Sequence, residues 1–381
     1  MKTLRRYLMR ELVRATAFVL FALLALFAFF DLLAQIDDLR PGTYMLPQAL
    51  AYVALSLPSR TYELTPIAAL IGAIFALSQL ASNSEFTIMR VSGMSTRALA
   101  VAVVRVGLVF VALTYAFGEL VAPVSERRAQ EVRAETRGQG AIGNKLRSGV
   151  WVRDAVRDAA GAVQRWRFIN VGIVRPDGSS VDWKIFEFDR EFRLLSIGTA
   201  AGGRFTPQAG SQSWQLTDVV ETRLPLVSTT DTAPADLRTE IVRMKERRWE
   251  SALTPNILGV LLVQPERMAA AELLGYIRHL SANRQQTEPY EIALWNKVFY
   301  PLAIVVMMML ALPFAYLHGR QGGVSLKIFA GVMIGVLFYM LNKLFAHVGV
   351  LHTWPPVAIA VLPSLVFLAA AIGALYWIER R

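Results

Sequence analysis

The sequence predicts an α-helical membrane protein with an inserted all-β domain, and three observations carry this prediction. Of its 381 residues, 54% are hydrophobic, which is more than a water-soluble protein of this size usually carries. Six apolar runs each supply the roughly 20 residues that a helix needs to cross the hydrocarbon layer of a bilayer. Between the third and fourth runs, short segments rich in β-branched and aromatic residues alternate with Gly, Pro and Asp, as strands and turns do.

The six expected transmembrane helices divide the chain into three parts. They cover about residues 15–36, 61–81, 98–120, 295–316, 325–346 and 355–377. Residues 1–120 therefore hold the first three, residues 121–290 the β domain, and residues 291–381 the last three. A shorter helix over about 46–57, closed by Pro58, is expected at the membrane surface. The strand signals fit an antiparallel sandwich, a jelly-roll or an open barrel.

Basic residues predict the orientation of the spans. An even number of spans puts both termini on one side, and the basic N-terminus, Arg90, Arg97, Lys327 and Arg381 all fall on that side. By the positive-inside rule it is the cytoplasm, so the large domain is expected on the opposite face. We expect a retained first helix and not a cleaved signal peptide, because its apolar run has full spanning length. The formal net charge is +11, and many of the basic residues lie beside the ends of the spans. This placement favours a membrane, and not nucleic acid, as the partner.

No motif for catalysis, metal binding or nucleotide binding is found. The chain has no cysteine, which excludes disulfides and thiolate metal sites, and its four histidines lack ligand spacing. Neither HExxH nor GxSxG occurs. The nearest approach to a phosphate-binding loop, residues 138–145, misplaces the lysine and lacks the Ser/Thr. We therefore expect no catalytic residue, no metal and no cofactor, and any ATP that drives this protein must be bound by a partner.

A short amphipathic segment, SNSEFTIMRVSGMS at residues 82–95, separates the second and third spans. Ser82 and Glu85 have the spacing of a capping box, Ser84 could cap instead, and Gly93 provides a stop, which predicts about two turns of helix.

One face of this segment could bind another protein. Phe86, Met89 and Arg90 share that face by their spacing, and Glu85 lies in the first turn, where the helix dipole favours a carboxylate. The alternative is a linker whose apolar side lies on the lipid headgroups, and the residues alone do not decide between the two.

Polar residues in and beside the spans are candidates for binding a lipid. Asp31 and Gln35 near the end of the first span lie at the depth of Asn342 and Lys343 in the fifth, so these groups could pair, bind a polar lipid head or simply anchor the helices. Arg133 belongs to a charged helix after the third span, which is either a solvated ion-paired face or a contact for an anionic substrate.

The fifth span also carries bulky apolar residues suited to acyl chains, although bulk lipid would suit them equally. They are Phe329, Met333, Phe338 and Leu341. Gly331 and Gly335 form a GxxxG motif that allows another helix to approach closely, and packing alone can explain it.

With these segments in view, the chain resembles the LptF/LptG family of lipopolysaccharide export permeases along essentially its full length. The resemblance rests on four segments, SNSEFTIMRVSGMS, GELVAP, EIALWNKVFYPLAIVVMMMLALPFAY and GRQGGVSLKIFAGVMIGVLFYMLNKLF. GELVAP and the short tail ending at Arg381 favour the LptG branch.

The resemblance implies a permease that extracts lipopolysaccharide from the bacterial inner membrane and passes it to a periplasmic bridge. It implies pairing with an LptF-like permease, two copies of an LptB-like ATPase that bind the ATP, and an LptC-like bitopic protein. It also implies that the domain over residues 121–290 is a periplasmic β-jellyroll, that residues 82–95 are the coupling helix bound by the ATPase, and that spans 1 and 5 admit the lipid.

The same resemblance assigns roles to individual residues. Glu85 matches the acidic position that contacts the ATPase, and Arg133 matches a basic position on the exit helix. The chain departs from the family at Asp31, where an ungapped comparison expects a lysine. Arg40 or Lys343 would have to supply the positive charge there, or the lipid phosphate is held differently.

Two other classes of function remain open at this stage. One is a membrane-anchored scaffold whose β domain binds a lipid or a protein without transport. The other is an ion-coupled secondary transporter, which the missing inverted repeat and the scarcity of central carboxylates disfavour.

Overall fold

The computed structural model describes residues 2–36, 39, 44–136, 149–157, 163–174, 179–208, 211–225, 239–251, 253, 258, 264–283, 285–316, 323–352 and 354–380. These residues form two compact units. One comprises residues 1–132, 265–277 and 287–381 and is helical; the other comprises residues 133–264 and 278–286 and holds the β-strands. Each is described by itself.

The helical unit begins with α1 (Lys2–Ile36), α2 (Leu46–Ser82), α3 (Glu85–Val91) and α4 (Thr96–Ala116), followed by η1 (Phe117–Val121) and α5 (Ala122–Thr136). After the strands come η3 (Pro265–Arg267), α8 (Ala270–Ala282), α9 (Glu288–Phe299), η4 (Tyr300–Leu302), α10 (Ala303–Leu310), α11 (Leu312–Tyr316), α12 (Val324–His352) and α13 (Pro356–Glu379). Within the described residues, six helical stretches are long and apolar enough to cross a membrane. The predicted multi-pass helical membrane protein is thus confirmed.

The second span corrects one expectation. α2 is a single helix of 37 residues that continues through Pro58 and Pro66, where we expected a separate surface helix ending at Pro58. A proline inside a helix removes one backbone hydrogen bond, which packing on both sides of it can offset. Here Tyr52 and Val53, before Pro58, are buried against α1 and α5, so the first turns of α2 are held in the helix by tertiary contacts.

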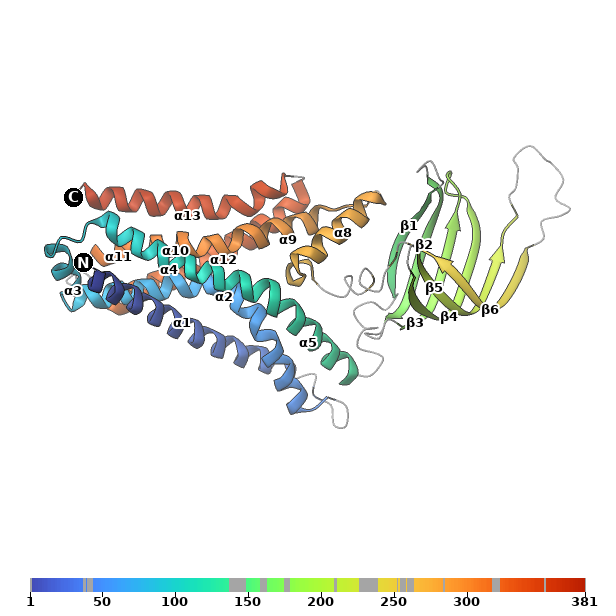
Figure 1. Ribbon diagram of the computed structural model, residues 1–381, viewed down its shortest axis with the longest axis horizontal. Helices are drawn as coiled ribbons and strands as arrows, with labels where there is room; N and C mark the ends of the chain where they lie inside the picture. Colours follow the sequence, from blue (N-terminus) through green and yellow to red (C-terminus); the bar gives the residue numbers. More distant parts are fainter. Residues whose placement is uncertain are drawn as a thin grey trace. The chain divides into compact units, whose positions relative to one another are not determined.

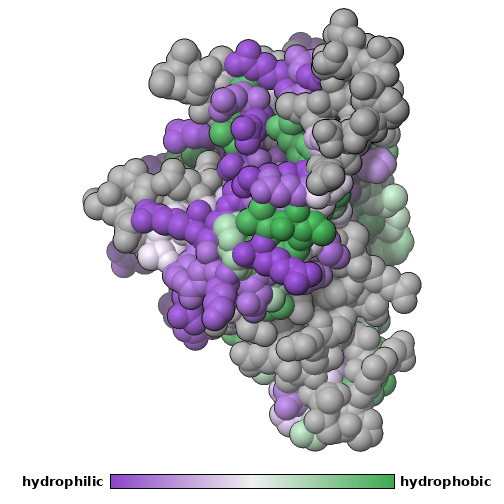
Figure 2. All heavy atoms as spheres, turned by 90° about the vertical axis from the view of Figure 1, so that its right-hand side faces the viewer, coloured by the Kyte–Doolittle hydropathy of each residue, from purple (hydrophilic) through white to green (hydrophobic). Residues whose placement is uncertain are grey.

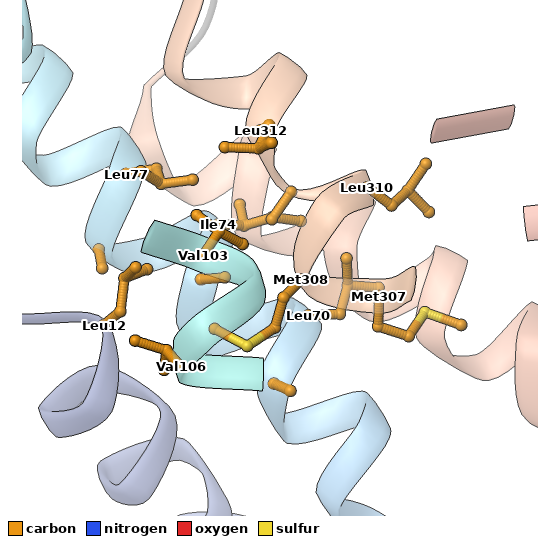
Figure 3. Close-up of a cluster of buried hydrophobic side chains, with 14 of the residues drawn as sticks. Leu12, Leu70, Ile74, Leu77, Val103, Val106, Met307, Met308, Leu310 and Leu312 are labelled. Carbon is orange, nitrogen blue, oxygen red and sulfur yellow. The ribbon is translucent and has the colours of Figure 1, made fainter. Parts of the chain in front are cut away.

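The core of the helical unit is formed by α1, α2, α4, α10 and α11 (Figure 3). Leu12, Leu70, Ile74, Val103 and Met308 point toward one another there, and all are buried. Small residues set the spacing of the helices around this core.

Three glycines lie at close contacts between α2 and its neighbours α1 and α12. A methyl group added to Gly72 of α2 would lie 2.5 Å from the Cα atom of Thr16 in α1. One added to Gly331 or Gly335 of α12 would meet Ile74 or Ile67 of α2 at 2.6 and 2.9 Å. The GxxxG motif therefore packs against α2 of the same chain.

The two ends of the helical bundle differ in what they carry. Both termini and α3 lie at one end in Figure 1, which we call the α3 end. The opposite end, the α5 end, holds the last turns of α1, the first half of α2, η1, α5, η3 and the start of α9. The long helix α1 and the helix α2 run between the two ends, while α3 belongs to one end only and η1, α5 and η3 to the other.

The second unit is a six-stranded antiparallel sheet. Its strands are β1 (Val150–Arg157), β2 (Val163–Val174), β3 (Ser179–Phe188), β4 (Leu194–Gln208), β5 (Ser211–Arg223) and β6 (Glu240–Glu250). They pair strictly in sequence order, as an up-and-down meander, and the sheet is strongly curved in Figure 1. The prediction of an inserted all-β domain is confirmed. β6 was not predicted, because its sequence EIVRMKERRWE is dominated by charged residues.

Tryptophans fill the core of the sheet. Trp183 packs against Trp214 and Trp249 with ring centroids 5.0 and 5.8 Å apart. Asp182 and Asp218 have positive φ and drop out of the strand pairing, while the register of the neighbouring pairs continues unchanged across both positions. The face that carries the sheet in Figure 2 is mainly hydrophilic where it is described, with a smaller hydrophobic patch.

Candidate functional site

The first candidate site is α3, seven residues long, at the α3 end of the bundle. The left-handed backbone of Gly93, with φ near 90°, ends this helix as expected. The capping prediction is wrong: Ser84 makes no side-chain cap, and the Ser82 hydroxyl donates instead to the Gln79 carbonyl oxygen at 2.9 Å. With no side-chain cap, α3 depends on contacts with other helices.

Those contacts come from the face that we expected to bind a partner. Phe86 and Met89 are buried in the core of the chain, and Phe86 packs edge-on against Tyr316 of α11 with ring centroids 5.1 Å apart. The Arg90 guanidinium lies over the same tyrosine ring at 5.2 Å. Because Phe86 and Met89 are already covered, they are not exposed to a partner here.

The outward face of α3 has different residues from those expected. Ile88 and Val91 are exposed, at 63% and 84%, beside the exposed Arg90. Glu85 is half-buried and accepts a hydrogen bond of 2.9 Å from the Tyr7 hydroxyl of α1. The available surface is therefore a small apolar patch flanked by a carboxylate and a guanidinium. Spacing alone identified two opposite faces, but not which of them the bundle would cover.

Some of the predicted lipid-binding residues are exposed in the structure and others are buried. Phe329 and Met333 of α12 are exposed, as contact with acyl chains requires, and Lys343 is exposed further along the same helix. Phe338 is fully buried against Phe367 and Tyr300, and Leu341 packs partly on the core. For Phe338 the assignment to lipid is corrected to internal packing.

Asp31 forms an internal ion pair. Both of its carboxylate oxygens accept from the Arg60 guanidinium of α2, at 2.8 and 2.9 Å, and Arg60 also donates to Glu63 at 3.1 Å. Gln35 accepts from the Tyr44 hydroxyl at 3.3 Å, so neither group pairs with Asn342 or Lys343. A bidentate carboxylate–guanidinium pair between two helices fixes their register, and Asp31 is accounted for without a lipid. Arg40 and the side chain of Arg133 lie outside the described residues.

A network of buried charges at the α5 end was not predicted. The ammonium group of Lys297 in α9 donates to the Glu119 carboxylate of η1 at 3.0 Å and to the Gly118 carbonyl oxygen at 3.2 Å. The other oxygen of Glu119 accepts from the backbone N–H of Ala270, at the start of α8, at 2.9 Å. A single carboxylate thus joins η1, α9 and α8.

A second carboxylate completes this network. Glu126 of α5 is 1% exposed and accepts from the Arg267 guanidinium of η3 at 2.5 Å and from the Ser59 hydroxyl of α2 at 3.2 Å. Burial alone would lower the pKa of Arg267, but the charge of Glu126 and its hydrogen bond outweigh this, and the pKa lies above its ordinary value. Arg127 of α5 also forms an ion pair with Glu272 of α8. These contacts attach η3 and the start of α8 to α5.

The signal that could have revealed the network was present in the sequence. Lys297 lies within an apolar run, and Glu119 lies at the end of another, where unpaired charges are costly. A lysine and a carboxylate at the same end of two spans predict a pair. The π-helical turn of η1, which places Glu119 toward Lys297, has no comparable signal in the sequence.

Comparison with known proteins identifies the family. The family model of the lipopolysaccharide export system permeases LptF/LptG matches residues 6–378. The chain belongs to the LptF/LptG family. Among curated members, LptG of Haemophilus influenzae is 29% identical over 381 residues, covering 100% of this chain and 98% of that protein. LptG of Escherichia coli is 28% identical over 372 residues, covering 98% and 97%, respectively.

The similarity to LptF is shorter. LptF of Escherichia coli is 29% identical over 133 residues, 35% of this chain and 36% of that protein. Full-length similarity to LptG and partial similarity to LptF agree with the LptG branch of the LptF/LptG family.

Proposed function

We propose that the chain is the permease subunit of an ABC transporter that extracts lipopolysaccharide from the bacterial inner membrane. It passes the lipid to a periplasmic bridge, and ATP hydrolysis in a partner ATPase drives the transfer. The family match over residues 6–378 and the full-length similarity to two LptG proteins support this proposal. The chain itself binds no ATP and catalyses no reaction; it pairs with an LptF-like permease, two LptB-like ATPases and an LptC-like acceptor.

The observation that carries the proposal is the outward face of α3. Ile88 and Val91 expose an apolar patch between charged neighbours, the composition of a small protein-binding surface. Both termini lie at the same end, and the distribution of basic residues supports a cytoplasmic location for that end. An ATPase that binds to α3 would therefore lie in the cytoplasm, where ATP is available.

Contacts between α3 and the rest of the bundle would transmit a movement of the bound ATPase to the transmembrane helices. Tyr7 joins Glu85 to α1, Tyr316 joins Phe86 and Arg90 to α11, and Met89 is buried in the bundle core. A displacement of α3 therefore acts on several helices at once. α1 and α12 expose large apolar side chains, among them Phe21 and Phe329, and would admit the acyl chains from the bilayer.

The test is reconstitution of the full complex in liposomes with lipopolysaccharide and an LptC-like acceptor. Wild-type complex should transfer lipid only when ATP is supplied. Ile88→Asp should lose both ATPase association and transfer, because a carboxylate enters the apolar patch without disturbing the core of the chain. Ile241→Asp is the matched control, since Ile241 of β6 is 60% exposed and lies in the other unit.

Glu85→Ala tests the contribution of the carboxylate beside the apolar patch. Loss of a hydrogen bond to a charged group costs about 1.5–3 kcal/mol, or roughly 10- to 150-fold in affinity for the ATPase. Normal association in both Ile88→Asp and Glu85→Ala would contradict the assignment of α3. A wild-type complex that binds lipopolysaccharide but never transfers it with ATP would instead favour a scaffold.

A further inference from the structure

The chain crosses between its two compact units within α5, before η3, within α8 and before α9. It leaves the helical unit after Val132 and returns at Pro265. α8 is divided between the units, since its residues up to Ile277 belong to the helical unit and those from Arg278 onward to the other. Contacts among α5, η3, α8 and α9 therefore decide whether the attachments of the sheet unit move together.

Three polar contacts, all between residues of the helical unit, join η1 and α5 to η3 and α8. They are Glu119–Ala270, Glu126–Arg267 and Arg127–Glu272, and we call them the clasp. The first contact places a carboxylate at the N-terminus of α8, where the helix dipole favours a negative charge and the backbone N–H has no partner within the helix. α8 thus begins at a side chain that precedes the sheet strands in the sequence.

Two buried groups connect the clasp to the rest of the bundle. Lys297 of α9 is 6% exposed and donates to Glu119, and Glu126 is 1% exposed and accepts from the Ser59 hydroxyl of α2. Separating either buried group from its charged partner would leave its charge uncompensated in a medium of low dielectric constant, which is costly. The clasp therefore resists opening, and it holds α5, η3 and the start of α8 against α2 and α9.

Apolar packing alone would hold α8 less strictly. Leu273 and Tyr276 of α8 are buried, and the Tyr276 ring packs against that of Tyr290 in α9 with ring centroids 4.7 Å apart. Such contacts have no strict direction and can be re-formed after a small rotation or shift. The clasp adds directional hydrogen bonds to η1 and α5, and a rotation of α8 would break them.

We propose that the residues of the clasp are positioning residues for lipid transfer. They keep the segments that lead to and from the sheet unit in one fixed arrangement with α2 and α9, so that these segments follow the bundle together throughout the transport cycle. Without the clasp, α5 and α8 would move separately, and a shift of the bundle would reach the sheet unit only in part. The role in transfer rests on the proposed function, whereas the attachment itself can be measured on the chain alone.

The first test measures the attachment by hydrogen exchange on the full-length chain in detergent micelles. The double variant Glu126→Leu/Arg267→Met removes the central contact of the clasp and leaves neither charge unpaired, so it separates loss of the contact from loss of folding. We expect the amides of residues 265–277 to exchange at least 10-fold faster and those of α10 to remain slow. Glu11→Gln is the control, because it removes an exposed ion pair with Arg14 on α1 and should leave residues 265–277 unchanged.

The second test measures coupling in the full complex reconstituted in liposomes. Glu126→Leu/Arg267→Met should bind the ATPase and support ATP hydrolysis as the wild type does, because α3 is untouched. The amount of lipid transferred per ATP hydrolysed should fall at least 10-fold. A merely structural defect would lower hydrolysis and transfer together, and their ratio would stay constant.

The third test holds the clasp closed. The chain has no cysteine, so Arg127→Cys/Glu272→Cys offers a single pair of thiols to a short bismaleimide. The reagent is applied to the purified chain and removed before the partners are added, and mass spectrometry confirms the crosslink. Because the clasp stays closed in the proposed cycle, the crosslinked chain should transfer at least as much lipid per ATP as the same variant without reagent. The single variant Arg127→Cys, treated in the same way, controls for modification of one thiol.

Three results would overturn the proposal. Unchanged exchange of residues 265–277 in Glu126→Leu/Arg267→Met would show that the clasp does not hold α8. Transfer per ATP equal to that of the wild type in this variant would remove the positioning role. Loss of transfer in the crosslinked chain alone would show that the clasp has to open. A wild-type complex that transfers no lipid contradicts the proposed function instead, and hydrogen exchange then decides the attachment by itself.

Discussion

The two ends of the helical bundle are held together by different forces. At the α3 end, α3 is attached by the buried side chains of Phe86 and Met89, with one exposed hydrogen bond from Tyr7 to Glu85. At the α5 end, helices are joined by ion pairs. Asp31–Arg60 is partly buried, and Glu119–Lys297 and Glu126–Arg267 each have one buried partner, Lys297 and Glu126.

Because of this difference, we expect the α3 end to shift more easily than the α5 end. Breaking a buried ion pair leaves an uncompensated charge in a medium of low dielectric constant, so these contacts resist displacement. Apolar contacts of a short helix can be re-formed after a small shift, because they have no strict direction. The comparison predicts which end tolerates substitution.

The largest expected effect comes from breaking the buried pair at the α5 end. Arg267→Met leaves the Glu126 carboxylate buried without its partner, and we expect the unfolding free energy to fall by about 3–5 kcal/mol. The measurement is denaturant unfolding in detergent micelles. Adding Glu126→Leu to Arg267→Met should restore much of the loss, because the charge itself is gone. If the single variant is as stable as the wild type, the pair contributes nothing and the comparison fails.

At the α3 end, Phe86→Ala should cost about 3 kcal/mol, the lower end of the range for this change, because a seven-residue surface helix can close part of the cavity. The loss should be local. Hydrogen exchange should speed up in α3 and remain slow in α5 and α9. Faster exchange spread evenly over the whole bundle would show that the α3 end is not an independent part.

A smaller effect is expected from Gly118→Ala at the α5 end. The added methyl group would lie 2.5 Å from the ring of Tyr62, and such overpacking costs about 1–3 kcal/mol. Gly275→Ala is the matched control, since nothing lies within 4 Å of the added methyl group there. We expect the control to be neutral or slightly stabilising in a thermal melt. Equal destabilisation by both changes would mean that helix propensity, and not packing, decides.

The smallest effect is expected from Tyr7→Phe, which removes only the hydroxyl that donates to Glu85. The contact is exposed and competes with water, so its loss should leave the global stability nearly unchanged. Its readout is the exchange rate of the first amides of α3, with Tyr376→Phe as control because Tyr376 is an exposed tyrosine on another helix. An unchanged rate in Tyr7→Phe would remove the proposed link between α1 and α3.

Much of the fold was predictable because it depends on composition and period. Apolar runs of spanning length and alternating β-branched segments are properties of the chain itself, and they gave the six spans and the inserted all-β domain. The continuity of α2 through Pro58 was not predictable, since it depends on burial of Tyr52 and Val53 against other helices. β6 was missed because its charged side chains hide the alternation.

The candidate sites were less predictable than the fold. Helical spacing showed that α3 has two faces, but burial of Phe86 rather than Ile88 is decided by Tyr316, more than 200 residues away in sequence. The Glu119–Lys297 pair has the same character, since its partners lie on opposite sides of the inserted domain. Contacts between distant segments have no local pattern.

The close approach at Gly72 has a mechanical consequence. Because the backbone of Thr16 occupies the space beside Gly72, no side chain separates α1 from α2 at that point. The Asp31–Arg60 pair joins the same two helices a second time, four turns further along α1. Two attachment points on one pair of helices oppose both sliding and rotation, so α1 and α2 behave as one rigid lever. A displacement of α1 must therefore carry α2 with it.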